Sequence, residues 1–263
     1  MGGKHLLTQT FLFVVFTTFA TESRAQTKVE ASPGIIVEKI KASKRPAVKA
    51  GDRIITIVRV DPERYDFRFL TENREGRRRT LPEWIRDENL TGGINAGMFL
   101  PDGRSCGYLR QDGDVRSNRR PGKFTGFVGF DPNGSHPPFI VSGKGCPYSF
   151  PWLSKRYRSI LQARAVMVDC RGRAVPWPNK RRFSMAGLGV DQNGWAVMFH
   201  SRTPYRPGVM AKMLADPALG IRGMVYMEGG PEASLVVNAG SHKVREVGSW
   251  EDGFWPNDDN LMF

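Results

Sequence analysis

Short β-branched segments separated by turn residues fill most of this sequence, and they constrain its fold more than any other feature. Residues 53–60 (RIITIVRV) and 165–169 (AVMVD) have the composition of strands. Asp-Gly at 112–113, Asn-Gly at 133–134 and DQNG at 191–194 predict hairpins. Because these hairpin signals outnumber long helical patterns, we expect an α+β domain, with a large, twisted, mostly antiparallel mixed sheet and a few packed helices.

A few other segments predict further elements. Residues 65–70 (YDFRFL) alternate, and we expect them to form a hairpin with the strand that precedes them. Thr80 with Glu83 three residues later forms a capping-box pattern, which predicts a short helix directly after Thr80. A second helix is expected to begin at Pro207, because the apolar residues up to Leu214 fall on one face.

The N-terminus has the pattern of a secretory signal peptide. A basic start is followed by a mostly apolar run from Leu6 to Ala20 and by a small-x-small cleavage signal that ends at Ala25. The apolar run is too short for a membrane anchor, which needs roughly 20 residues. We therefore expect a signal peptide (1–25), a loosely held N-terminal arm rich in Lys, Ala, Pro and Ser (26–49) and one domain (50–263). The protein is expected to be secreted or periplasmic, with no integral membrane segment after signal removal.

The chain carries a formal net charge of +13, and removal of the signal peptide lowers it by one. Strong positive charge favours anionic partners such as nucleic acid, an anionic membrane face or a phosphorylated or acidic glycan. Export argues against nucleic acid, and the sequence has no RNA-binding motif or zinc-finger spacing. A surface made basic for solubility remains the alternative. The sequence does not fix the oligomeric state.

The cysteines and histidines give no sign of a metal site. Cys106, Cys146 and Cys170 are too few and too widely spaced, and the histidines lack the spacing of metal ligands. We therefore expect no metal and no cofactor. In an oxidising compartment one disulfide is possible, and loop length favours Cys146 with Cys170, although the other pairings stay open.

The chain is organised around residues 225–237 (VYMEGGPEASLVV). Two apolar runs typical of buried strands flank a corner that contains Glu228, Gly229 and Gly230. Paired glycines allow a ligand to approach the main chain closely beside the Glu228 carboxylate. The alternative is a plain β-turn whose glycines serve only the bend.

Asn95 lies in a similar context, in the segment 94–99 (INAGMF) after a pair of glycines. An amide in an unusual backbone conformation is able to donate and accept hydrogen bonds to a ligand. A turn is again the alternative.

Together these motifs resemble the phosphodiester glycosidase domain family. Segment 94–99 is similar to the family's Asn-Gly-Gly-Phe-Phe stretch, 186–191 (AGLGVD) to its central strand, and 228–230 with Ser234 to its Asp-Gly-Gly-Gly-Ser stretch. The motifs occur in the family's order, and the resemblance covers roughly residues 50–250. It implies the same sheet-rich fold and cleavage of a glycosyl phosphodiester.

This chain departs from the family in two places. The family often has an Arg-Thr pair in its central strand, where this chain has Met185 and Ala186, so the phosphate must find another cation. The family's acid is an Asp, whereas Glu228 is one methylene longer and would shift the carboxylate unless the backbone compensates.

The resemblance assigns roles to individual residues. Glu228 is expected to be the catalytic carboxylate, as nucleophile or base, and Asn95 to hydrogen-bond the sugar or phosphate. Glu232 is interpreted as a solvated or structural acid and His200 as a core or rim histidine. The residues expected to bind substrate or phosphate are Gly97, Arg182, Arg202, Gly229, Gly230 and Ser234.

Three functions are compatible with the sequence. The first is an exported hydrolase that cleaves a sugar-1-phosphodiester in an anionic glycan or glycoconjugate. The alternative is a non-catalytic exported module that binds anionic envelope polysaccharide or exopolysaccharide. A hydrolase of ordinary glycosides would need two carboxylates facing one sugar, and only Glu228 has a suitable context.

Overall fold

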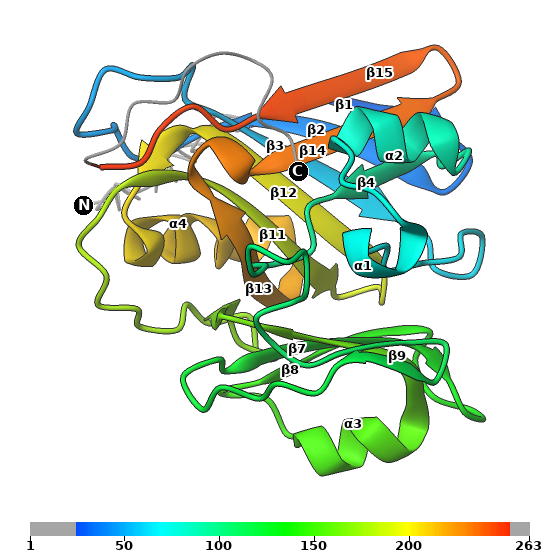
Figure 1. Cartoon of the computed structure of the whole chain (residues 1–263). Coiled ribbons are helices and arrows are strands. Elements are labelled where there is room, and N and C mark those ends of the chain that lie inside the picture. Colours follow the sequence, from blue (N-terminus) through cyan, green and yellow to red (C-terminus); the bar gives the residue numbers. More distant parts are fainter. Residues whose placement is uncertain (1–24, 253–263) are drawn as a thin grey trace, which may run out of the picture.

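The computed structural model describes residues 25–252, in which strands far outnumber helices (Figure 1). Every pair of neighbouring strands among these residues is antiparallel. The expected α+β fold with extensive antiparallel sheet is therefore confirmed. The expected signal peptide lies almost entirely outside the described residues.

The largest sheet has seven strands in the order β1-β2-β3-β12-β11-β13-β10. The β11–β12 hairpin turns at the predicted DQNG sequence, which confirms that prediction. Neighbours in this sheet come from distant parts of the chain. The strands are β1 (Ala25–Ser32), β2 (Ile35–Lys41), β3 (Ile54–Val60), β10 (Ala165–Val168), β11 (Phe183–Asp191), β12 (Ala196–Tyr205) and β13 (Ile221–Gly229).

Two smaller sheets complete the fold. A five-stranded sheet has the order β6-β5-β9-β7-β8, and both of its predicted hairpin turns are confirmed. A three-stranded sheet has the order β15-β14-β4. Their strands are β4 (Gly92–Ile94), β5 (Leu109–Gln111), β6 (Asp114–Ser117), β7 (Gly126–Pro132), β8 (Phe139–Gly143), β9 (Tyr157–Ala163), β14 (Ser234–Ala239) and β15 (His242–Val247).

Short helices cover these sheets. Both predicted helices form, and Thr80 and Glu83 make the reciprocal hydrogen bonds of a capping box at the start of α2. The helix from residue 150 was not predicted. The helices are α1 (Glu72–Glu75), α2 (Leu81–Asp87), α3 (Phe150–Arg156) and α4 (Pro207–Leu214), with the 3-10 turns η1 (Pro217–Leu219) and η2 (Gly230–Glu232).

The core is layered. One face of the seven-stranded sheet packs on α4, through residues such as Phe199 and Met210. The opposite face packs on the five-stranded sheet, through residues such as Val225 and Val128. Helix α3 covers the outer face of the five-stranded sheet, as Figure 1 shows. Apolar side chains on both faces of β13 therefore hold this strand in place.

The N-terminal arm requires a correction. Residues 26–49 were expected to be loosely held, yet β1 and β2 form one edge of the seven-stranded sheet. The apolar residues Ile35, Val37 and Ile40 are buried there, and their burial outweighs the polar composition of the segment. The expected domain start at residue 50 therefore falls inside the folded domain.

The hairpin expected between residues 53–60 and 65–70 is wrong. Both edges of β3 are already paired, with β2 on one side and β12 on the other. Residues 65–70 instead run as irregular backbone, from which Phe67 and Phe69 pack on the core. Alternation alone therefore located the buried side chains but not the strand pairing.

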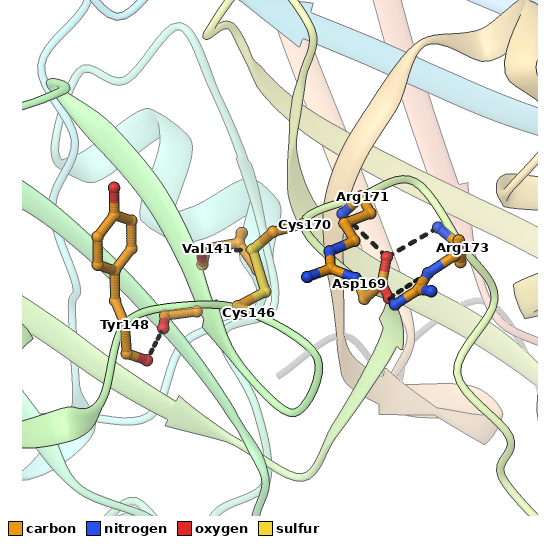
Figure 2. Close-up of a disulfide and its surroundings, with 8 residues drawn as sticks. Val141, Cys146, Tyr148, Asp169, Cys170, Arg171 and Arg173 are labelled. Carbon is orange, nitrogen blue, oxygen red and sulfur yellow. Dashed lines mark hydrogen bonds and ion pairs between the residues drawn. A yellow bond between two sulfur atoms is a disulfide. The ribbon is translucent and has the colours of Figure 1, made fainter.

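The disulfide between Cys146 and Cys170 forms as loop length favoured, and Cys106 is a free thiol (Figure 2). Cys146 follows β8, and Cys170 follows β10. The bond therefore ties the five-stranded sheet to the edge of the seven-stranded one. Within residues 25–252, no helix has the length and apolar character needed to cross a bilayer.

Candidate active site

The Glu-Gly-Gly corner connects β13 to η2. Glu228 pairs with Ala186 of β11, next to a register shift that bends the end of β13. A Cβ on Gly229 would lie 2.5 Å from the Tyr226 hydroxyl, and Gly230 has a φ of 70°. Glycine is therefore required at both positions, by close packing at the first and by backbone conformation at the second.

The Glu228 carboxyl is half-buried and has an unusual pKa. Burial raises its pKa to about 8, and the charges of Glu232 and Glu251 act in the same direction. The backbone N–H of Gly229 donates to Glu228 Oε1 over 3.1 Å and opposes the shift only in part. Glu228 is therefore mostly protonated at neutral pH.

Met185 and Ala186, which stand where the family often has an Arg-Thr pair, form part of the surroundings of Glu228. Both residues are fully buried, and Ala186 is the cross-strand neighbour of Glu228. An arginine at this place, as the family resemblance implies, would lie beside the carboxyl. No arginine is among the groups that shift the pKa of Glu228, so a cation does not offset its burial.

Asn95 and Ser234 are hydrogen-bonded to each other beside the Glu-Gly-Gly corner. The N–H of Ser234 donates to Asn95 Oδ1 over 3.0 Å, which extends the pairing of β4 with β14. Asn95 Nδ2 and Ser234 Oγ are buried and have no hydrogen-bond partner among the described residues. A Cβ on Gly97 would lie 4.0 Å from the carbonyl oxygen of Met227, so this segment runs beside the end of β13. The two unpartnered atoms are available to a ligand.

Two further acids surround Gly230. A Cβ on this glycine would lie 3.2 Å from Glu251 Oε2 and 3.3 Å from Glu232 Oε2. Glu251 is paired with Arg181 over 2.7 Å. Burial and the charge of Glu251 raise the pKa of Glu232. We call Glu228, Glu232 and Glu251 the acid corner. In the described part of the chain, no three His, Cys, Asp or Glu side chains are arranged to hold a metal ion.

Four residues that were not predicted for the site interact electrostatically with Glu228 or with its neighbours. Burial and the charge of Glu228 raise the pKa of Cys106, and the charge of Arg119 opposes this. Burial and the same acid raise the pKa of Tyr226, and Arg164 opposes that shift. Cys106, Arg119 and Arg164 are distant from Glu228 in sequence, so no local spacing could have identified them, whereas Tyr226 lies two residues before Glu228 on β13.

The role of the two predicted phosphate clamps stays a prediction. Arg182 pairs with Asp252 over 3.3 Å, and Arg202 is exposed on β12. Neither residue lines the cavity described below. The predicted role of the Gly229 N–H in anion binding must also compete with its hydrogen bond to Glu228. Gly230 supplies the left-handed turn.

His200 is a core histidine in this structure. It is buried in β12, and its Nε2 lies 3.2 Å from the carbonyl oxygen of Ala233. Burial lowers its pKa to about 4, although Glu246 and this hydrogen bond oppose the shift. The ring is therefore neutral at physiological pH and donates to Ala233, which fixes the backbone next to Ser234.

A cavity of about 270 Å³ opens beside the acid corner. Asn95, Gly97 and Glu232 line it, together with the segment before α2 and the inner faces of the sheets. Glu232 is thus half-buried at a cavity wall, unlike the solvated acid expected from the sequence. The cavity brings three of the candidate positions to one surface. Glu228 is not one of the lining residues, but Gly97 lies beside the carbonyl oxygen of Met227, the residue before Glu228.

Comparisons with known proteins agree with this geometry. A family model described as phosphodiester glycosidase matches residues 88–259. No curated protein sequence matches the chain.

Two solved structures share the fold. A hypothetical protein from Synechocystis aligns with a TM-score of 0.60 at 14% identity, over 87% of this chain and 62% of that chain, so this chain spans less than two thirds of it. The catalytic domain of zebrafish N-acetylglucosamine-1-phosphodiester alpha-N-acetylglucosaminidase, auto-inhibited by its pro-peptide, aligns with a TM-score of 0.56 at 15% identity, over 81% of each chain. At such identities both likenesses concern the fold alone.

Proposed function

Because the chain belongs to the phosphodiester glycosidase family, we propose that it hydrolyses the bond between a sugar and the phosphate of a sugar-1-phosphodiester. The resemblance carried by the three sequence motifs is confirmed at the level of the family. The substrate and the roles of individual residues are our proposal.

One observation carries this proposal. Glu228 is a carboxyl group with a pKa of about 8, and it adjoins a cavity lined by Asn95 and Glu232. A strongly shifted carboxyl at the edge of a cavity is typical of glycosidase acids. The sequence alone suggested that Glu228 is a base or nucleophile, but a carboxyl that holds its proton at neutral pH is better suited to be the acid.

The proposed step uses two carboxyl groups. The C1–O bond of the sugar breaks, and its electron pair stays on the departing phosphate oxygen. A water oxygen forms the new bond to C1. Glu228 donates its proton to the departing phosphate, and Glu232, as a carboxylate, accepts the proton that the water loses. The products are a free reducing sugar and a phosphate monoester.

Hydrogen-bond donors near the acid corner would hold the phosphate. Asn95 Nδ2 and Ser234 Oγ lack partners among the described residues, and a phosphate oxygen would accept from both. Arg119 lowers the pKa of Cys106 and Arg164 lowers that of Tyr226, and both of these residues also feel the charge of Glu228. We propose these two arginines as phosphate contacts in preference to Arg182 and Arg202.

We also propose that the protein acts outside the cytoplasm. The signal-peptide pattern over residues 1–25 supports export, and the disulfide between Cys146 and Cys170 is typical of an oxidising compartment. The name of the zebrafish enzyme describes action on an N-acetylglucosamine 1-phosphodiester. Phosphodiesters of N-acetylhexosamines are therefore the first substrates to test here.

A substrate screen tests the function. The purified protein would be incubated with aryl and sugar phosphodiesters of several hexosamines, with release of reducing sugar and of phosphate monoester measured separately. We expect both products in equal amounts. Binding of anionic polysaccharide without turnover of any phosphodiester would favour the non-catalytic module instead. Release of alcohol with the sugar still phosphorylated would assign cleavage to the other phosphate bond.

A further inference from the structure

The deep part of the cavity beside the acid corner is apolar. Its walls there come from both sheets and from the irregular segment after β3, and their side chains carry no hydrogen-bonding groups. The residues that form these walls are Phe69, Leu109, Phe130, Phe139, Leu188 and Met198.

This lining argues against a sugar in the deep cavity. A sugar ring carries several hydroxyl groups, each of which loses hydrogen bonds to water when it is buried without a partner. An alkyl, prenyl or aromatic group loses nothing on entering such a space and gains from removal of its surface from water. The chemistry of the walls therefore selects an apolar occupant.

The polar part of the cavity lining carries charges of both signs, from the acids Asp66, Glu72 and Glu232 and from the arginines Arg68, Arg78 and Arg79. Asn95 and Glu232 line the cavity on the side of the acid corner. Arg78 and Arg79 also line the cavity, and each is paired with an acid, Arg78 with Glu72 over 3.0 Å and Arg79 with Glu88 over 3.0 Å. An occupant with an apolar body and a polar end would match both parts of the cavity.

The order of groups in a phosphodiester fits this arrangement. The phosphate lies between the sugar and the alcohol, so a sugar held at the acid corner places the alcohol on the far side of the phosphate. With the phosphate near Asn95, the alcohol points into the apolar part. Figure 1 shows α1 and α2 beside β4. Phe99, which lines the cavity, is 38% exposed.

We propose that the substrate is a sugar-1-phosphodiester whose alcohol is apolar, an alkyl, prenyl or aryl group that occupies this cavity. This inference rests on the proposed function for the sugar end. It concerns the alcohol, which the glycosidase chemistry leaves unspecified.

A chain-length series tests the inference through turnover. Hexosamine 1-phosphates esterified with methanol, butanol or octanol would be compared by kcat/KM. We expect kcat/KM to rise by roughly threefold to fourfold for each methylene that enters the cavity, the equivalent of about 0.8 kcal/mol per buried CH2. Equal values for the methyl and octyl esters would overturn the inference and leave the glycosidase function intact.

A binding measurement separates the two proposals. Octyl phosphate and inorganic phosphate would be titrated into the protein by calorimetry, without any sugar present. We expect octyl phosphate to bind at least tenfold more tightly. Tighter binding of octyl phosphate, with no turnover of any sugar phosphodiester, would support an apolar group in the cavity and contradict the proposed function. Equally weak binding of both probes would overturn the cavity proposal.

A matched pair of variants locates the effect. Phe99 and Tyr148 are both 38% exposed aromatic residues, but only Phe99 lines the cavity. Phe99→Ser is expected to lower the octyl-to-methyl ratio of kcat/KM severalfold, and Tyr148→Ser to leave it unchanged. The same fall in both variants would contradict the assignment of the alcohol to this cavity.

Discussion

Asp169 and Glu228 lie at opposite ends of the neighbouring strands β10 and β13, and their surroundings differ in almost everything that sets a carboxyl pKa. Asp169 accepts hydrogen bonds from the N–H groups of Arg171 and Arg173 and from the Arg173 guanidinium, as Figure 2 shows. Burial alone would raise the pKa of Asp169, but these donors hold it below its usual value.

Glu228 has only one hydrogen bond, from the next N–H along the chain. Its charged neighbours are other acids, so burial and repulsion raise its pKa to about 8. An acid at the end of an apolar strand therefore gives two different groups, depending on its neighbours in the folded chain. Asp169 is ionised and stabilises a loop, while Glu228 is mostly protonated at neutral pH. Four measurements would break or sharpen this contrast.

The largest expected effect is on turnover. Glu228→Gln should lower kcat for a hexosamine phosphodiester by roughly 10²–10⁴-fold, because an amide cannot deliver the proton. Asp169→Asn is the matched control, since it makes the same chemical change at the structural acid. Steady-state assays of both variants check this, and similar turnover in Glu228→Gln and the parent protein would remove Glu228 from the mechanism.

The next effect concerns the disulfide beside Asp169. Replacing both Cys146 and Cys170 by serine should lower the free energy of unfolding by about 3 kcal/mol, because the unfolded chain is no longer constrained by this loop. The bond spans a sequence separation of 24 residues. Urea unfolding measures the change, and Cys106→Ser serves as the control for loss of a thiol. An unchanged midpoint would show that the bond does not stabilise the domain.

Asp169→Asn should itself lower stability by about 1–2 kcal/mol, since an amide accepts these hydrogen bonds less strongly and carries no charge opposite Arg173. The Arg173 side chain is 63% exposed, so most of the effect is expected from the two backbone N–H groups. Comparison with Arg173→Ala in urea unfolding separates these contributions. A larger loss of stability in Arg173→Ala than in Asp169→Asn would show that the guanidinium contributes more than the two backbone N–H groups.

The smallest expected effect is the pH dependence of stability. The pKa of Glu228 in the folded protein lies above the usual value of 4.5, so its protonated form stabilises the fold below about pH 4.5, and this is lost as the pH rises to about 8. Gln cannot ionise, so Glu228→Gln should gain roughly 1–2 kcal/mol over the parent protein between pH 5 and pH 9, after allowance for solvent contact. Urea titrations at both values measure this, with exposed Glu63→Gln as control. If Glu228→Gln and the parent protein differed in free energy of unfolding by the same amount at pH 5 and at pH 9, the pKa of Glu228 would be normal.

Local patterns predicted the local parts of the fold. The capping box at Thr80, the hairpin turn at residues 191–194 and the glycine corner after Glu228 each depend on neighbours in sequence, and each forms as expected. The pairing of residues 65–70 failed because strand partners are decided by distant segments competing for the same edge.

The residues of the candidate site also fall into two groups, those that sequence motifs identified and those that they did not. Glu228, Asn95 and Ser234 were found from motifs, although their roles stay predictions. Cys106 and Arg119 were not found, because only the packing of separate loops brings them towards Glu228. Charged side chains reach a site through three-dimensional structure, so sequence distance alone could not decide whether Arg182 or Arg202 contacts the phosphate.

The hydrogen bond between Asn95 and Ser234 joins residues 139 positions apart. A ribosome must therefore release most of the polypeptide before these two groups can meet. A chain that stops before Ser234 has neither β14 nor the pairing that orients the Asn95 amide. Interrupted translation would therefore yield fragments that lack the assembled site, and catalytic competence would arise only once the last strands are in place.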